Sequence, residues 1–304
     1  MGTVFACNRL TDQMLNDIKH TLTTLQQNAR RPPRIVTFCA TNDSTAHSYL
    51  AQQQRTGQRL GIDVIPHDAR GQTVEDIAAE ADVYEHQDTS DGIIFLRPMD
   101  AALQHIAVHQ LSPSKDIDCQ GGQSHAILRN TPYDIDLPET MHLPPTGKAC
   151  LDVLNAYHIP ITRARIALFT NGSVGTPLKT ILERQGATIN LYGSKRLPTR
   201  ELNADIIIST ADTPCIHPHF IKPGTAVIDL ARIPHEGKLT GSLIDYGACK
   251  DRAGLITPEP GTKKDGSIGA VMTAALFQNV TNSYKHGLEY RKTVFARPVP
   301  RIAA

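Results

Sequence analysis

The sequence lacks an excess of either charge. Its 304 residues contain 31 Lys and Arg against 30 Asp and Glu, a formal net charge of +1. General nucleic-acid binders and proteins held on acidic membranes need a basic excess, so both classes are disfavoured. No apolar run approaches the roughly 20 residues that span a bilayer. The N-terminus also lacks the basic and then apolar pattern of a signal peptide. We therefore expect a cytoplasmic globular protein whose partners are neither nucleic acid nor membrane.

Paired cysteines are missing as well. The chain has no Cys-x-x-Cys motif, which excludes the common zinc and redox patterns and indicates reduced thiols. Its scattered cysteines are Cys7, Cys39, Cys119, Cys150, Cys215 and Cys249. Histidine is plentiful, but the closest group, His217 and His219, flanks a proline in an expected loop. We expect no metal there. Internal repeats and low-complexity tracts are absent too.

Apolar runs alternate with helical periodicity along the chain. Strands are expected at 34–40, 62–66, 91–96, 165–169, 187–192, 204–210 and 225–230. Helices are expected at 11–28, after 43, from 73, and at 100–110, 147–156 and about 268–286. A further helix, through 182, follows a turn at 170–177, whereas 111–145 should be largely loop. Strands that alternate with helices predict parallel sheets with right-handed crossovers. The series restarts near residue 148, so we predict an α/β protein with two α/β lobes.

The stretch 41–61 combines a helix start with a polar pair. Asp43 or Ser44 can cap a helix that follows the strand at 34–40. Tyr49 and Gln53 are four residues apart, so they share one face of that helix. Such a pair is typical of an α/β active site. The alternative is that Tyr49 is a half-buried core residue and Gln53 a solvated one.

The segment 165–182 reads as strand, turn and helix. In a Rossmann-type domain this is where a dinucleotide binds, because amides at the helix N-terminus meet the pyrophosphate. The turn contains only Gly172 and Gly175, which is less than the full glycine-rich motif. The same two glycines are also compatible with a simple tight turn.

Short segments in a characteristic order carry a family resemblance over about residues 10–285. They are Tyr49 with Gln53, then 59–62, 92–98, 114–118, 174–177, 221–224, 227–229 and 257–261. In these segments the chain resembles the bifunctional methylenetetrahydrofolate dehydrogenase/cyclohydrolase family. The resemblance implies two lobes around a cleft and commonly a homodimer. It assigns 1–147 to a catalytic, folate-binding lobe that a C-terminal helix at about 268–290 completes, and 148–267 to a Rossmann-type, doubly wound parallel sheet.

The resemblance also implies roles for individual residues. It gives catalytic positions to Tyr49, Gln53 and Asp118. Folate contacts fall on Tyr49, Leu96, Asp118, Pro260 and Gly261. Nucleotide contacts fall on Thr170, Asn171, Gly172, Ser173, Val174, Gly175 and Ser194. Two alternatives stay open: Asp118 caps a loop, and Lys115 forms a surface ion pair instead of replacing a missing base.

The chain departs from the family pattern at several of these positions. Gln53 stands where the family has a catalytic Lys, and Leu96 where it has the Gln that orients this Lys. Cys119 replaces the Gly after Asp118. The family's Gly-Arg-Ser turn becomes 169–171, its His-Ser pair becomes 193–194, and its Gly-rich segment is replaced at 262–267.

These departures leave three hypotheses for the function. A Lys with a lowered pKa can relay protons for the cyclohydrolase step, whereas Gln has no titratable group. Hydride transfer needs only a positioned substrate and the nucleotide, so it survives the loss of the Lys. We therefore expect a tetrahydrofolate-dependent oxidoreductase with NAD or NADP and impaired cyclohydrolase activity. The alternatives are a repurposed one-carbon transfer enzyme and a catalytically silent folate-binding protein.

Overall fold

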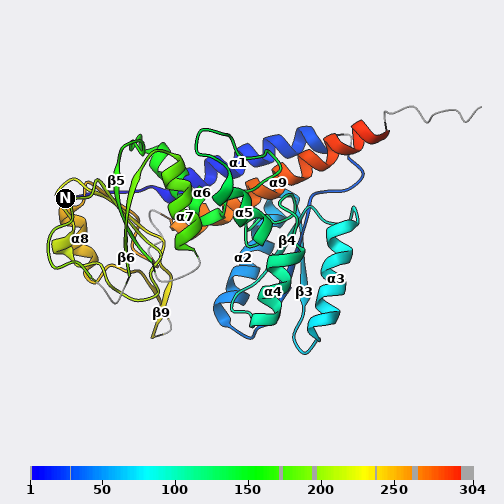
Figure 1. Cartoon of the computed structure of the whole chain (residues 1–304), viewed down its shortest axis with the longest axis horizontal. Coiled ribbons are helices and arrows are strands. Elements are labelled where there is room, and N and C mark those ends of the chain that lie inside the picture. Colours follow the sequence, from blue (N-terminus) through cyan, green and yellow to red (C-terminus); the bar gives the residue numbers. More distant parts are fainter. Residues whose placement is uncertain are drawn as a thin grey trace, which may run out of the picture. The chain divides into compact units, whose positions relative to one another are not determined.

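The chain folds into two compact α/β units (Figure 1). The computed structural model describes residues 2–27, 29–170, 174–193, 197–236, 238–261 and 266–295. One unit comprises Met1–Leu15, His125–Leu137 and Pro144–Ala275, and is called here the six-stranded unit. The other comprises Asn16–Ser124, Pro138–Leu143 and Leu276–Ala304, and is called the three-stranded unit. The predicted α/β class with parallel sheets is confirmed.

The three-stranded unit is a small parallel sheet with crossover helices. Its strand order is β3-β2-β4. The strands are β2 (Arg34–Cys39), β3 (Asp63–Asp68) and β4 (Gly92–Phe95), and the helices are α2 (Ser44–Leu60), α3 (Val74–His86) and α4 (Ala101–Gln110). Helices α1 (Cys7–Gln26) and α9 (Ile268–Phe295) contribute residues to both units. Because all three strands are parallel, their carboxyl ends meet at one edge.

Alternation along β2 divides its side chains between the two faces of the sheet. Phe38 stacks on Phe95 with ring centroids 4.8 Å apart, in a buried cluster that also contains Ile77 of α3 and Leu103 of α4. Thr37 points to the opposite face, where it bonds to Gln53 of α2. The sheet is therefore covered by α3 and α4 on one face and by α2 on the other.

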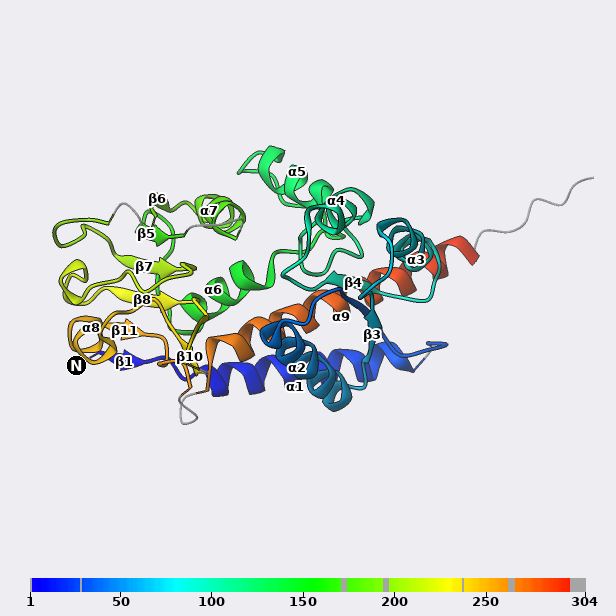
Figure 2. The ribbon, with the colours of Figure 1, turned by 90° about the horizontal axis from the view of Figure 1, so that it is seen from below.

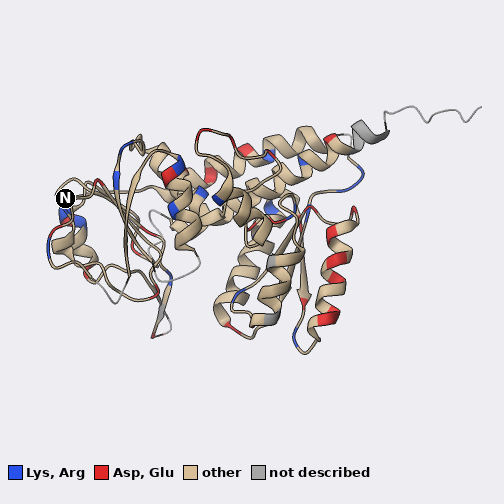
Figure 3. Ribbon diagram, viewed as in Figure 1, with Lys and Arg blue, Asp and Glu red and all other residues tan. Residues whose placement is uncertain are grey.

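Local sequence explains where the crossover helices begin and end. The carboxylate of Asp43 accepts hydrogen bonds from the amides of Thr45 and Ala46, and Gly61 ends α2 with φ of 71°. Thr73 caps α3 in the same way. The acidic side chains of α3 (Figure 3) begin in its first turn with Glu75 and Asp76, where the helix dipole favours negative charge.

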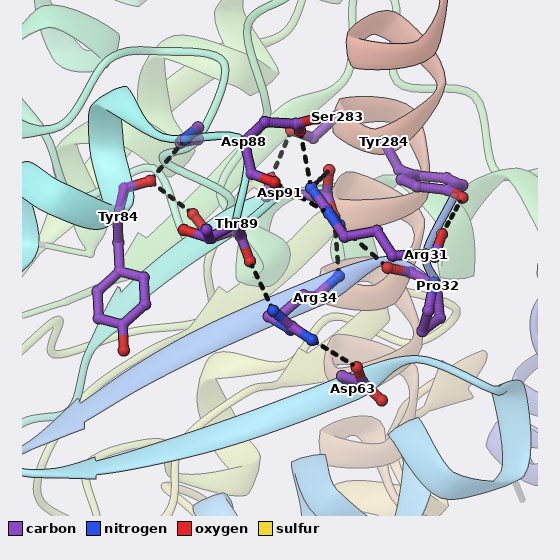
Figure 4. Close-up of polar contacts among 12 residues, drawn as sticks. Arg31, Pro32, Arg34, Asp63, Tyr84, Asp88, Thr89, Asp91, Ser283 and Tyr284 are labelled. Carbon is purple, nitrogen blue, oxygen red and sulfur yellow. Dashed lines mark hydrogen bonds and ion pairs between the residues drawn. The ribbon is translucent and has the colours of Figure 1, made fainter. Parts of the chain in front are cut away.

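The amino ends of β2 and β4 are tied to α9 by buried polar contacts (Figure 4). The guanidinium of Arg31 donates to both oxygens of Asp91, which is only 5% exposed. Ser283 of α9 donates to the carbonyl of Asp91, and Tyr284 donates to the carbonyl of Arg31 at 2.6 Å. Asn279 adds a bond to the carbonyl of Ile117. The amino edge of this sheet is therefore taken up by structural contacts with α9.

The six-stranded unit is a fully parallel sheet of order β1-β11-β8-β7-β5-β6 (Figure 2). The strands are β1 (Thr3–Val4), β5 (Arg165–Phe169), β6 (Thr188–Tyr192), β7 (Ile206–Ser209), β8 (Ala226–Asp229) and β11 (Leu255–Ile256). The helices are α6 (Pro145–Ala156), α7 (Gly175–Arg184) and α8 (Tyr246–Arg252), with η1 (Pro218–Phe220) and the hairpin β9 (Ile233–His235) and β10 (Lys238–Thr240). The chain adds β6 on one side of β5 and then continues with β7 on the other side, so the order of strands reverses between β5 and β7. This is the switch point where doubly wound sheets bind ligands.

Some elements differ from the sequence-based expectation. The segment expected to be loop contains α5 (Gly122–Asn130), and α9 extends to Phe295. Strands β1 and β11 were not predicted because each has only two residues, too few to show a period. No described helix has the length and apolarity needed to cross a bilayer.

Candidate functional site

Gln53 lies inside the three-stranded unit and not in solvent. Its side chain is 0% exposed, on the buried face of α2 that also carries Ala46 and Gly57. Thr37 Oγ1 donates to Gln53 Oε1 at 3.0 Å. Gln53 Nε2 is buried and has no hydrogen-bond partner among the residues that the structure describes. The interpretation of Gln53 as a solvated residue is wrong, whereas Tyr49, one turn earlier, is partly exposed.

Leu96 is a buried apolar residue at the carboxyl end of the three-stranded sheet. It directly follows β4, is 4% exposed, and donates its amide to the carbonyl of Phe38 at 2.9 Å. Alternation from Phe95 turns the Leu96 side chain towards the face that α2 covers. An apolar side chain offers no hydrogen bond there. The polar partner of Gln53 is therefore Thr37, which our sequence analysis did not single out.

The loop that bears Asp118 is held by the buried carboxylate of Asp116. Oδ1 accepts from the amide of Gln120 at 2.9 Å, and Oδ2 accepts from the amide of Gly121 at 2.8 Å and from Ser124 Oγ at 2.6 Å. Cys119 has φ of 52°, so the loop keeps the left-handed conformation that glycine favours. The loop-fixing role therefore belongs to Asp116, and Asp118 takes no part in these backbone bonds.

Asp118 accepts a hydrogen bond from the side-chain amide of Gln120. Burial raises the pKa of the Asp118 carboxyl from its ordinary 3.8 to about 7, with a further rise from the charge of Asp116. The Gln120 bond and the charge of Arg97 act in the opposite direction. The carboxyl therefore changes charge near neutral pH, in a place where ligand donors would favour the ionised form.

We expect the raised pKa of Asp118 to make stability fall with pH. Between about pH 4 and pH 7 the unfolded chain has lost this proton while the folded protein holds it. The free energy of unfolding should decrease through that window, by at most about 1.4 kcal/mol per pH unit. Urea unfolding of the wild type and Asp118→Asn at several pH values checks this. The Asn variant should gain relative stability as pH rises, and parallel curves would contradict the assignment.

Lys115 is not a surface ion pair and is not positioned as a base. Its ammonium donates to the carbonyls of Tyr84 at 2.6 Å and Gln87 at 3.0 Å, at the C-terminal end of α3. Burial lowers its pKa below the usual value. The carbonyl of Lys115 bonds to the amide of Ile93, near the start of β4. Lys115 thus serves the amino edge of the sheet, the opposite edge from Leu96.

In the six-stranded unit, Thr170 lies directly at the switch point. Its Oγ1 accepts from Thr210 Oγ1 at 2.9 Å, which links the carboxyl ends of β5 and β7. A Cβ added to Gly175 would lie 2.3 Å from Thr170 Oγ1, so only glycine allows this close approach at the start of α7. Val174 is 43% exposed beside it. The other predicted nucleotide contacts, Asn171, Gly172, Ser173 and Ser194, lie outside the described residues.

The segment with Pro260 and Gly261 follows β11 in the same unit. Thr257, at its start, accepts from the amide of Asp229 at 3.0 Å. The buried carboxylate of Asp229 accepts from the amide and hydroxyl of Ser242, and burial raises its pKa. Gly261 has φ of +89°. The carboxyl ends of β8 and β11 are thereby joined, and Pro260 and Gly261 are placed just beyond them.

Metal chemistry has no candidate centre in the part of the chain that the structure describes. No group of three or more His, Cys, Asp or Glu side chains is arranged there to hold an ion. The rings of His217 and His219 are 5.2 Å apart, and both pack against Phe220.

Two family models match the chain in succession. The tetrahydrofolate dehydrogenase/cyclohydrolase catalytic domain matches residues 5–118, and the NAD(P)-binding domain of the same family matches residues 144–288. The chain belongs to the tetrahydrofolate dehydrogenase/cyclohydrolase family. The expected family is therefore confirmed. Its two domains are described as a catalytic domain for tetrahydrofolate chemistry and an NAD(P)-binding domain.

Individual members of this family are distant relatives. The bifunctional protein FolD of Clostridium beijerinckii is 25% identical over 288 residues, covering 92% of this chain and 96% of the relative. FolD 1 of Frankia casuarinae is 29% identical over 258 residues, covering 81% and 86%. The crystal structure of FolD from Campylobacter jejuni has a TM-score of 0.82 at 20% identity, covering 94% of this chain and 100% of that one. At 20% sequence identity, this structural similarity shows that the two chains share a fold.

Proposed function

We propose that this protein oxidises methylenetetrahydrofolate with a nicotinamide nucleotide and does not hydrolyse the methenyl product. The observation that carries the proposal is the buried bond between Gln53 and Thr37, together with the buried, apolar Leu96 directly after β4. According to the resemblance, the family has a catalytic Lys at the position of Gln53 and its Gln partner at the position of Leu96. A buried neutral amide orients a hydrogen bond but cannot take up or release a proton near neutral pH.

The folate contacts in this proposal come mainly from the three-stranded unit. Tyr49 offers a partly exposed ring one turn before Gln53. Asp118 offers a carboxylate for the N–H groups of the pterin, and Leu96 offers apolar surface. Pro260 and Gly261 are the contacts proposed from the six-stranded unit. The folate and nucleotide roles of the two lobes, the homodimer and the cytoplasmic location stay predictions.

The residues at the switch point of the six-stranded unit fit a nicotinamide nucleotide. The start of α7 supplies backbone amides for phosphates, and Gly175 lies there in close contact with Thr170. When bound, the nucleotide supplies the hydride acceptor. The protein's own part is to hold the substrate carbon near it and to exclude water. A catalytically repurposed folate enzyme is the second candidate, favoured by the inward orientation of Thr170.

We predict little preference between NAD and NADP. The Thr170 hydroxyl is engaged by Thr210 and its side chain covers Gly175, so this position supplies no cation for a 2′-phosphate. Dissociation constants from calorimetry should agree within about threefold, or about 0.7 kcal/mol. Lys195 and Arg196, which lie outside the described residues, are the other cations that the sequence offers for a 2′-phosphate. A strong NADP preference that persists after both are changed to Ala would contradict this prediction. Absence of binding by both nucleotides would reject the oxidoreductase and favour the second candidate.

A further inference from the structure

His105 and His109 form an exposed pair of imidazoles on α4, apart from the proposed folate and nucleotide contacts. They are four residues apart, so they lie on one face of the helix in successive turns. Their ring centroids are 4.2 Å apart, and the ring planes are inclined by 52°. Neither ring forms a hydrogen bond or an ion pair with another described residue. Their nitrogens are therefore open to a ligand from solvent.

The rest of α4 holds this pair in place. Leu103, Ile106 and Ala107 are buried on the inward side of the helix, in the cluster that contains Phe38. The carboxylate of Asp100 caps the first turn by accepting from the amide of Leu103 at 2.8 Å. The two histidines thus stand on an anchored helix, which fixes the spacing of their backbones.

Two imidazoles with this spacing are suited to chelation of a metal ion. The helical zinc motif His-Glu-x-x-His presents its two histidines with the same separation of four residues. Imidazole nitrogens lie about 2.0–2.1 Å from Zn²⁺, so two of them in a tetrahedral arrangement are roughly 3.3 Å apart. Rings with centroids 4.2 Å apart reach this separation by rotation about χ2, a soft torsion in histidine. Nitrogen ligands favour Cu²⁺ and Zn²⁺, whereas Mg²⁺ and Ca²⁺ prefer oxygen.

We propose that His105 and His109 together bind one divalent transition-metal ion at the surface of the three-stranded unit. The pair supplies two ligands, and water fills the remaining positions. Because the described residues offer no group of three or more ligands, the site differs from a catalytic or structural metal centre. The ion joins two successive turns of α4 and stabilises the folded protein, since the unfolded chain lacks the fixed spacing. The site does not depend on the proposed folate function.

The first experiment titrates the full chain, without a polyhistidine tag, with Zn²⁺ by calorimetry. The six cysteines are buried, so their thiols do not compete for the ion. His105→Ala and His109→Ala should each weaken the strongest site at least about tenfold, or about 1.4 kcal/mol. His20→Ala removes an exposed histidine of α1 that has no histidine four residues away, and should leave the affinity unchanged. Equal affinity of the wild type and both single α4 variants would overturn the inference.

Two double variants test the spacing of the histidines rather than their number. Ala101→His with His109→Ala moves the pair one turn towards the start of α4, at exposed positions, and should bind within about threefold of the wild type. Gln104→His with His109→Ala also keeps two exposed histidines, but adjacent residues of a helix do not face each other. This adjacent pair should bind as weakly as His109→Ala alone. Binding as tight as that of the wild type would contradict chelation across one turn.

Electron spin-echo spectroscopy with substoichiometric Cu²⁺ counts the imidazoles on the ion. The wild type should show two coordinated imidazoles and His109→Ala only one. Circular dichroism and thermal melting without metal check that each variant is folded, and His109→Gln replaces His109→Ala if the alanine variant is not. Two coordinated imidazoles in a folded variant that lacks His109 would place the ion elsewhere and refute the assignment.

Discussion

The unmodified protein should hydrolyse methenyltetrahydrofolate no faster than buffer does. Proton relay is expected to be missing because position 53 holds an amide that is 0% exposed and bonded to Thr37. General acid–base catalysis contributes about 10²–10⁴-fold to such steps, so its loss should be plain in the assay. The measurement is the loss of methenyl absorbance, with the buffer-catalysed rate subtracted.

Restoring the family's Lys at position 53 and its Gln at position 96 should restore part of this activity. Gln53→Lys alone should fail, because Leu96 offers the ammonium no hydrogen bond and burial disfavours its charge. Gln53→Lys with Leu96→Gln should recover measurable hydrolysis, since Thr37 Oγ1 can also accept from the new ammonium. Leu96→Gln alone is the control. Robust hydrolysis by the unmodified protein would require another base, such as the exposed His47, and would refute the assignment.

Asp118→Ala should bind reduced folate far more weakly than the wild type. Loss of a charge-assisted hydrogen bond costs about 1.5–3 kcal/mol, which corresponds to roughly 10- to 150-fold in the dissociation constant. The loop should survive, because its backbone is held by Asp116. Calorimetry with tetrahydrofolate is the measurement, and Asp17→Ala, an exposed carboxylate in the same unit, is the matched control. Unchanged affinity would show that the pterin is held elsewhere.

Much of the fold can be predicted from the apolar runs in the sequence. Strands at 34–39, 165–169 and 206–209 are buried throughout or nearly so, because crossover helices cover both faces of a parallel sheet. Helix α5 was not expected because Gly122–Asn130 has only three apolar side chains among polar ones. Strand β11 gains its hydrogen bonds from β8, a tertiary partner that no local pattern reveals.

The site was predictable only in part, and for physical reasons. Tyr49 and Gln53 were paired by their four-residue spacing on one helix face. The family resemblance then gave roles to these two residues and to Asp118, and those roles stay predictions. Thr37 was missed because a single hydroxyl inside an apolar strand looks like a β-branched core residue. Its polar role appears only when α2 is packed on β2. Asp116 was missed because its carboxylate acts through bonds to the amide of Gln120 and the hydroxyl of Ser124, which exist only once this loop has folded.

The most direct test follows the products of methylenetetrahydrofolate oxidation in a single reaction. The protein is mixed with methylenetetrahydrofolate and either NAD or NADP, and methenyl- and 10-formyltetrahydrofolate are quantified over time beside the reduced nucleotide. The proposed function predicts that methenyltetrahydrofolate accumulates in step with the reduced nucleotide and converts to the formyl compound only at the buffer rate. Formyl product formed as fast as the nucleotide is reduced, or no reduction of either nucleotide, would contradict it.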